Sequence, residues 1–159
     1  MCPSEDCKTP LDPSREITFE TIEKMLDDLI GSQKDGMFPG EFFHIGGDEV
    51  DTTCWNKVDH VVEWMKKKNF TANDAYGYFV NRMDSMVRSR QRETIAWEEV
   101  YVNHKNIINK DMIIQIWLGD GERLKNAVKD GFRVIASSYK HWYLPQLWET
   151  WDIYYGYDW

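Results

Sequence analysis

Long hydrophobic segments are missing from this 159-residue sequence, and their absence excludes one class of protein. A helix that crosses a bilayer needs about 20 consecutive apolar residues, and no run here approaches that length. The sequence therefore predicts no membrane span. No secretory signal peptide is recognisable at Met1 either.

Basic residues are also few. The sequence has 19 Lys and Arg against 27 Asp and Glu, which gives a net charge of −8 and a pI near 5.0. Nucleic-acid binding usually requires a clustered basic surface. The single basic run, residues 66–68, is typical of the last turn of a helix, where cations complement the helix dipole. We therefore expect no nucleic-acid partner.

Cysteine is rare, whereas aromatic residues are plentiful. Cys2, Cys7 and Cys54 form an odd number, so at least one thiol lies outside any pair within the chain. No local Ser-His-Asp or Cys-His motif is present.

Aromatic residues make up 14% of the sequence and include eight Trp. Aromatic faces stack on the apolar C–H patches of sugars, although most Trp side chains are expected to belong to the core.

Apolar periodicity predicts alternating helices and strands. Phe19, Ile22 and Leu26 recur at helical spacing, for example. The expected elements are helix 18–30, loop 32–41, strand 42–45, a helix bearing Val58, Val61, Val62 and Met65, helix 73–90, strand 94–97, strand 112–117, helix 121–130 and strand 133–137. Strands that are apolar almost throughout predict an α/β fold with a parallel sheet covered on both faces. Four such strands make about half of a (β/α)₈ TIM barrel, which typically needs about 250 residues.

Helix ends are also indicated by local residues. Thr71 and Asp74 resemble a capping box, with Asp in place of the usual Glu or Gln. Gly31 and Gly131 each follow a predicted helix, where glycine often ends it. We expect one domain over residues 1–159.

The most informative segment is residues 42–50, Phe-Phe-His-Ile-Gly-Gly-Asp-Glu-Val. Its apolar start predicts a buried strand, which Gly46 and Gly47 end. Asp48 and Glu49 follow at once. In parallel α/β proteins the loop after a strand usually carries the chemistry, and glycines there allow backbone or ligand to approach closely. These two carboxylates are the candidate catalytic residues; capping of the following helix is the alternative.

Residues 44–50 resemble the signature of the family 20 glycoside hydrolases, the β-N-acetylhexosaminidases. The similarity extends over roughly residues 7–159, where further motifs follow in the family's order: Cys7, Pro10-Leu11-Asp12, Cys54-Trp55, Trp97-Glu98-Glu99-Val100, Ile116-Trp117 and Trp142-Tyr143-Leu144. The family's catalytic domain is a (β/α)₈ barrel. The resemblance therefore implies a partial catalytic domain, roughly strands 4 to 7 with the intervening helices.

This resemblance also implies an activity. Members of the family release terminal, non-reducing β-linked N-acetylglucosamine or N-acetylgalactosamine from glycans by substrate-assisted catalysis that retains the anomeric configuration. The family residue at Asp48 orients the 2-acetamido group that attacks the anomeric carbon, and the one at Glu49 is the general acid and then the base. Adjacent carboxylates suit this better than the usual pair, which flanks the bond about 5–10 Å apart. The alternative is a truncated, inactive fragment that acts at most as a glycan-binding module.

Five further residues are substrate-binding candidates through the same resemblance. Trp97 and Trp117 would wall the acetamido pocket, and the Tyr143 hydroxyl would bind the acetamido carbonyl, with ordinary packing as the alternative. Trp142 lies next to Tyr143 in that motif. His44 either orients Asp48 or a neighbour by a hydrogen bond, or is a buried strand histidine with its hydrogen bonds satisfied.

One position departs from the family pattern. Members usually carry Asp two residues after the tyrosine, but Pro145 stands there and has no side-chain acceptor. Asp152 is a candidate substitute for this aspartate after an insertion.

Metal binding is the alternative use of the acidic residues that follow strand 42–45, because Asp48, Glu49 and Asp51 could attract Mg²⁺ or Ca²⁺. Because no calcium-type loop is present and the family needs no metal, we expect neither a metal site nor a cofactor.

The resemblance implies a Cys7–Cys54 disulfide, with Cys2 unpaired, and hence an oxidising compartment. Asn69-Phe70-Thr71 is a glycosylation sequon. Together these features predict a lysosomal or secreted protein. Its expected partner is a glycan substrate, and a homodimer is possible in the full-length protein.

Overall fold

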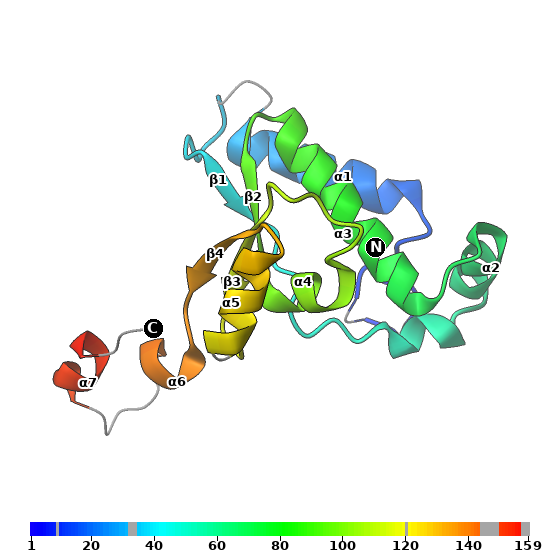
Figure 1. Ribbon diagram of the computed structural model, residues 1–159. Coiled ribbons are helices and arrows are strands. Elements are labelled where there is room, and N and C mark those ends of the chain that lie inside the picture. Colours follow the sequence, from blue (N-terminus) through cyan, green and yellow to red (C-terminus); the bar gives the residue numbers. More distant parts are fainter. Residues whose placement is uncertain (9, 32–34, 120, 144–149, 157–159) are drawn as a thin grey trace.

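A four-stranded parallel sheet forms the centre of the molecule (Figure 1). The computed structural model describes residues 1–8, 10–31, 35–119, 121–143 and 150–156. The strands lie side by side in sequence order, and they are β1 Phe42–His44, β2 Glu93–Trp97, β3 Ile113–Ile116 and β4 Arg133–Ala136. Parallel neighbours need a crossover between them, and helices provide each one. The predicted α/β class and parallel sheet are confirmed.

The helices are α1 Glu16–Ile30, the 3₁₀ helix η1 Thr52–Lys57, α2 Asp59–Lys68, α3 Ala72–Ser89, α4 Glu98–His104, α5 Gly121–Lys129, α6 Tyr139–Trp142 and α7 Trp151–Tyr155. Helices α1 and α3 lie side by side, while α6 and α7 extend away from the sheet (Figure 1). Helix α4, which has seven residues and begins directly after β2 without a loop, was not predicted, and neither were η1, α6 and α7. Helices this short give little periodic signal.

The helix boundaries follow the residues that predicted them. Thr71 Oγ1 accepts the backbone N–H of Asp74 at 3.1 Å, and the Asp74 carboxylate accepts the N–H of Thr71 at 2.8 Å. The capping box is therefore present. Gly31 ends α1 with a φ of 67°, and Gly131 follows α5 with a φ of 91°. These left-handed conformations favour glycine.

Only one face of the sheet is covered by the described helices. The side chains of Thr94, Ala96 and Ile114 are fully buried beneath them. On the alternate face, Ile135 is 37% exposed, and Phe42 at the sheet edge is 50% exposed. The predictions of two covered faces and of a buried Phe42 are therefore wrong for the described chain. An apolar strand shows that both of its faces suit burial, but not which element buries them.

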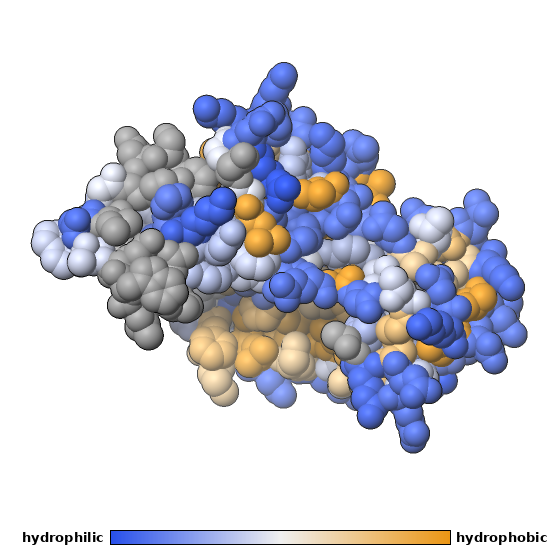
Figure 2. Space-filling model, turned by 90° about the horizontal axis from the view of Figure 1, so that it is seen from below, coloured by the Kyte–Doolittle hydropathy of each residue, from blue (hydrophilic) through white to orange (hydrophobic). Residues whose placement is uncertain are grey.

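One face of the molecule is mostly hydrophilic. Figure 2, seen from below, shows largely hydrophilic residues, with apolar side chains gathered along the lower edge of the view. No helix among the described residues is long and apolar enough to cross a membrane.

Two contacts tie the first residues of the chain to the segment that follows the candidate catalytic pair. Cys7 and Cys54 form a disulfide, with their Cα atoms 5.4 Å apart, whereas Cys2 is free and exposed. Asp12 is fully buried, and its carboxylate lies 2.6 Å from Nε2 of His60 on α2. The disulfide and this contact hold η1 and α2 in place beside the loop after β1.

Removing the disulfide should destabilise the chain. The bond spans 47 residues of sequence, and a loop of that length corresponds to roughly 4 kcal/mol of stability in the chain-entropy model. We expect Cys54→Ser to lower the free energy of unfolding by about this amount in urea titrations. Cys2→Ser, the control, should change it little. Non-reducing peptide mapping that finds Cys2 bonded to Cys7 or Cys54 would contradict the pairing.

Candidate active site

The backbone turns sharply after β1. Gly46, Gly47 and Glu49 all have positive φ angles, of 74°, 95° and 47°. The N–H of Trp97 donates to the Gly46 carbonyl at 3.0 Å, and the N–H of Gly46 donates to Nδ1 of His44 at 2.9 Å. Hydrogen bonds from β2 and from the strand itself therefore fix the start of the turn. Such conformations persist where the surroundings determine them strongly.

Gly47 is required by space as well as by conformation. A Cβ atom at this position would lie 2.5 Å from Cγ2 of Val100 on α4. Since Val100 is fully buried, it has little freedom to move aside. The turn is thus pressed against α4, and only glycine fits there.

Asp48 and Glu49 are both exposed. The negative charge of Asp48 acts on the ionisation of four groups, namely His44, Tyr76, Glu99 and Tyr143. The Asp48 carboxylate therefore lies near groups of β1, α3, α4 and the segment after α6. The left-handed backbone of Glu49 turns the chain away immediately after it.

An aromatic cluster lies at the same edge of the sheet. Trp117 follows β3 and stacks on Tyr143, with ring centroids 6.1 Å apart and planes at 12°. Trp97, the last residue of β2, meets Trp117 at 6.1 Å, and His44 meets Trp97 at 4.9 Å. The structure thus brings together four of the five predicted substrate-binding residues. Tyr139 also contacts Trp117, at 6.4 Å.

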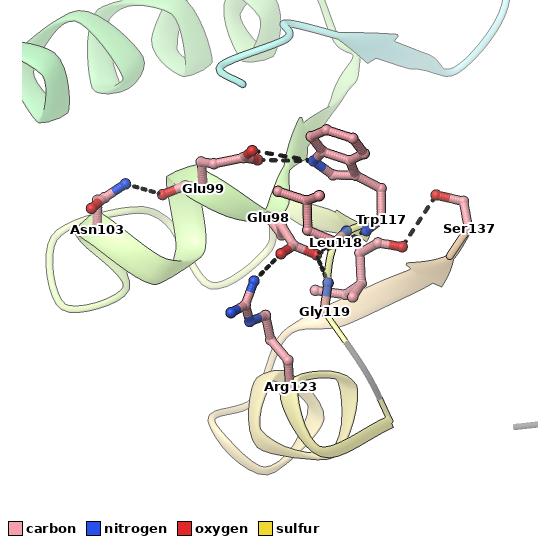
Figure 3. Close-up of polar contacts among 9 residues, drawn as sticks. Glu98, Glu99, Asn103, Trp117, Leu118, Gly119, Arg123 and Ser137 are labelled. Atoms are coloured by element: carbon pink, nitrogen blue, oxygen red, sulfur yellow. Dashed lines mark hydrogen bonds and ion pairs between the residues drawn. The ribbon is translucent and has the colours of Figure 1, made fainter. Parts of the chain in front are cut away.

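Two acidic residues at the start of α4 hold Trp117 (Figure 3). The Glu99 carboxylate accepts the indole N–H of Trp117, with both oxygens at 3.2 Å. Oε2 of the fully buried Glu98 accepts three backbone N–H groups of residues 117–119, at 2.8, 3.1 and 2.9 Å. Its Oε1 pairs with Arg123 of α5. A buried carboxylate with this many charge-assisted partners fixes the loop after β3.

The roles of Glu98 and Glu99 were not predicted, although both belong to the motif Trp97-Glu98-Glu99-Val100. A signal was available, because this acidic pair follows β2 much as Asp48 and Glu49 follow β1. Residue type alone could not separate the two pairs. Glu98 is buried, while Asp48 and Glu49 are exposed.

Burial shifts the ionisation of several groups around the turn. It raises the pKa of Glu99, and the charges of Glu98 and Asp48 raise it further, against the hydrogen bond from Trp117. Burial also raises the pKa of Tyr143, again with help from Asp48. It lowers the pKa of His44, partly offset by the Gln115 side chain and by Asp48. His44 is therefore biased to the neutral form, which lets Nδ1 accept the Gly46 N–H.

His44 acts on the turn rather than directly on Asp48. Its Nδ1 accepts the Gly46 N–H, and the ring also interacts with the Gln115 side chain, although Nε2 has no partner in full hydrogen-bonding geometry. A weakly bonded ring nitrogen beside an aromatic cluster is a group that a ligand or water can use.

Other candidate residues lie apart from the turn or outside the described chain. Trp142 is on α6 and 46% exposed. Asn69 is exposed and adopts a left-handed conformation at the end of α2. Asp152 is exposed on α7, and Pro145 lies outside the described residues. Within the part of the chain that the structure describes, no group of three or more His, Cys, Asp or Glu residues is arranged to hold a metal ion.

Comparisons with known proteins agree on one family. The profile of the glycosyl hydrolase family 20 catalytic domain matches residues 2–159. Beta-hexosaminidase 1 of Arabidopsis thaliana is 39% identical over 156 residues, which cover 98% of this chain and 28% of that protein. Beta-hexosaminidase 3 of the same plant is 35% identical, with the same coverage.

Solved structures give the same result. A family 20 exo-β-N-acetylglucosaminidase from Vibrio harveyi, crystallised as an inactive mutant, superposes with a TM-score of 0.72 at 25% identity. That match covers 85% of this chain and 20% of the other. The chain thus spans about 28% of the length of the two Arabidopsis proteins. With its four parallel strands as part of the barrel, the chain belongs to glycosyl hydrolase family 20.

Proposed function

We propose that this chain carries the catalytic acids of a β-N-acetylhexosaminidase that releases terminal β-linked N-acetylglucosamine or N-acetylgalactosamine. The observation that supports this most is the exposed turn after β1, which places Asp48 and Glu49 at the same edge of the sheet as the aromatic cluster of Trp97, Trp117 and Tyr143. Two adjacent acids beside such a cluster suit two different tasks in one reaction.

The arrangement favours a substrate-assisted mechanism. A retaining enzyme with a carboxylate nucleophile places its two carboxyl groups about 5–5.5 Å apart on opposite sides of the scissile bond. Asp48 and Glu49 are consecutive residues of one exposed turn, so they are poorly placed to flank a bond from opposite sides. In our proposal Glu49 protonates the leaving oxygen and then activates water. Asp48 orients the acetamido N–H and stabilises the positive charge of the cyclised intermediate.

The aromatic cluster suits the acetamido group. The faces of Trp97 and Trp117 offer apolar walls for its methyl group, and Trp117 is held by Glu98 and Glu99. The Tyr143 phenol, whose pKa burial raises, remains a donor for the acetamido carbonyl. Holding a weak amide nucleophile in an attacking geometry lowers the barrier to its attack, because the entropy cost is met on binding.

The proposed compartment is lysosomal or secretory. The Cys7–Cys54 disulfide supports it, because such bonds persist mainly in oxidising environments. The exposed position of Asn69 is compatible with glycosylation at the sequon.

A glycan-binding role without catalysis is the second candidate. It is favoured by the uncovered face of the sheet and by the exposure of both acids, since an active site normally excludes water. The two candidates differ in turnover, not in the ligand they bind.

Turnover of a chromogenic β-N-acetylglucosaminide distinguishes these two functions. The 159-residue chain is compared with a hybrid in which residues 2–159 replace the matching segment of Arabidopsis beta-hexosaminidase 1. We expect the hybrid to release the chromophore, because the remaining barrel strands enclose the site. A hybrid that folds and binds N-acetylglucosamine without any turnover would instead support the glycan-binding role.

Glu49→Gln in this hybrid should lose activity unequally between substrates. A general acid contributes about 10²–10⁴-fold, but activated phenols need little protonation when they leave. We therefore expect kcat to fall far more for a disaccharide than for a nitrophenyl glycoside. Glu41→Gln, a change at an exposed acid before β1, is the control. Equal losses on both substrates would contradict the role of Glu49 as the acid.

Asp48→Asn should lower kcat by about a hundredfold or more, because an amide cannot offset a developing positive charge as an anion does. It should also weaken binding of a thiazoline mimic of the cyclised intermediate by a larger factor than it raises KM. That pattern marks an interaction made mainly in the transition state. Unchanged thiazoline affinity would mean that Asp48 is only a structural neighbour of Glu49.

A further inference from the structure

We infer that Tyr76, on α3, is a positioning residue for the catalytic turn, because its phenol holds the Gly47 carbonyl directly before Asp48 and Glu49. The inference rests on the proposed function for its effect on turnover. The clamp itself is a feature of the fold and can be measured without turnover.

The hydrogen bond joins a buried side chain to the turn. The Tyr76 hydroxyl donates to the carbonyl oxygen of Gly47, 29 residues away in sequence. The tyrosine is 6% exposed, and its ring meets the edge of His104 with centroids 4.5 Å apart. His104 is on α4 and is itself 4% exposed. Because α3 and α4 together fix the ring, the hydroxyl has one well-defined position from which to hold the turn.

This bond completes a series of contacts along the turn. The Gly46 N–H and carbonyl are held by His44 and Trp97, and the Gly47 carbonyl is held by Tyr76. Asp51 begins the next fixed segment, since its carboxylate accepts the N–H of Thr53 at 2.9 Å. Asp48 and Glu49 therefore lie in a short span between two anchored points, which restricts where their carboxylates can reach.

A cavity beside the turn gives it room to move, so the hydrogen bond from Tyr76 matters for its position. The cavity has a volume of about 180 Å³, and its mostly apolar lining includes Gly47 and Tyr76 together with Ile45, Val50 and Trp55. Packed neighbours resist a shift on one side, where Gly47 contacts Val100. The cavity offers no such resistance, so without the phenol the turn has room to move toward it.

The phenol is also kept in its donor form. Burial raises the pKa of Tyr76, and the negative charges of Glu99 and Asp48 raise it further. A phenolate could not donate to a carbonyl oxygen. The Asp48 charge thus supports the bond that positions it.

The test compares Tyr76→Phe with Tyr101→Phe. Tyr101 is 5% exposed and donates its hydroxyl to Asp130 at 2.8 Å, so it is a matched buried phenol away from the turn. Both variants keep the ring and lose one hydrogen bond. Amide hydrogen exchange on the 159-residue chain should become faster over residues 46–51 in Tyr76→Phe only. In the hybrid, Tyr76→Phe should lower kcat by about ten- to a hundredfold and change KM much less. Small misplacements of catalytic groups have effects of this size on rate.

Each outcome decides the inference. Unchanged exchange over residues 46–51, or equal kcat losses in the two variants, would overturn it. So would a kcat loss accompanied by faster exchange throughout the chain, because that pattern marks general destabilisation. If the hybrid with Tyr76 intact has no turnover, the proposed function fails. The local exchange of the two variants then decides the clamp alone.

Discussion

Parallel strands in sequential order place the residues that follow each strand at one edge of the sheet. The catalytic candidates follow β1, the acidic pair that holds Trp117 follows β2, and Trp117 itself follows β3. Residues separated by about 70 positions in sequence thereby share one site. The hydrogen-bonded register supplies this convergence, for example between His44 and Ile95 and between Trp97 and Gln115. A change of one residue in that register would turn the side chains to the opposite face.

Two acidic pairs at this edge have opposite physical roles. Glu98 is fully buried, with its charge matched by three backbone N–H groups and by Arg123. Such a carboxylate is a structural anchor, since breaking one of its contacts leaves a buried charge without its partner. Asp48 and Glu49 are exposed, so their carboxylates remain available for a ligand. One pair thus fixes the aromatic cluster, and the other is the candidate catalytic pair at the same edge of the sheet.

Backbone conformation matters as much as side-chain chemistry in this site. The turn contains two glycines and a left-handed Glu49, a conformation that a side chain adopts at some cost. Contacts from three directions maintain it: β2 through Trp97, α4 through Val100 and α3 through Tyr76. The position of the acids therefore depends on helices that carry no catalytic group.

Much of this protein was predictable from local sequence, because the determining interactions are themselves local. Apolar periodicity located the four strands and the longer helices, and the Thr71–Asp74 pair marked the start of α3 through hydrogen bonds three residues apart. The glycines and acids of residues 46–49 marked the turn that carries the candidate catalytic residues. Resemblance to a family supplied Trp97, Trp117 and Tyr143, which the structure brings into one cluster.

Other features were decided only in three dimensions. Glu98 and Asp48 are the same kind of residue in similar positions, and the sequence does not say that one is buried and the other exposed. The role of Tyr76 depends on a hydrogen bond to Gly47, which lies 29 positions away in sequence. The role of Val100 depends on how closely its side chain approaches Gly47. The apolar strands predicted a sheet covered on both faces, yet the described helices cover one. Sequence sets the periodicity, caps and chemistry of each segment, whereas burial, charge environment and long-range contact exist only once the segments pack.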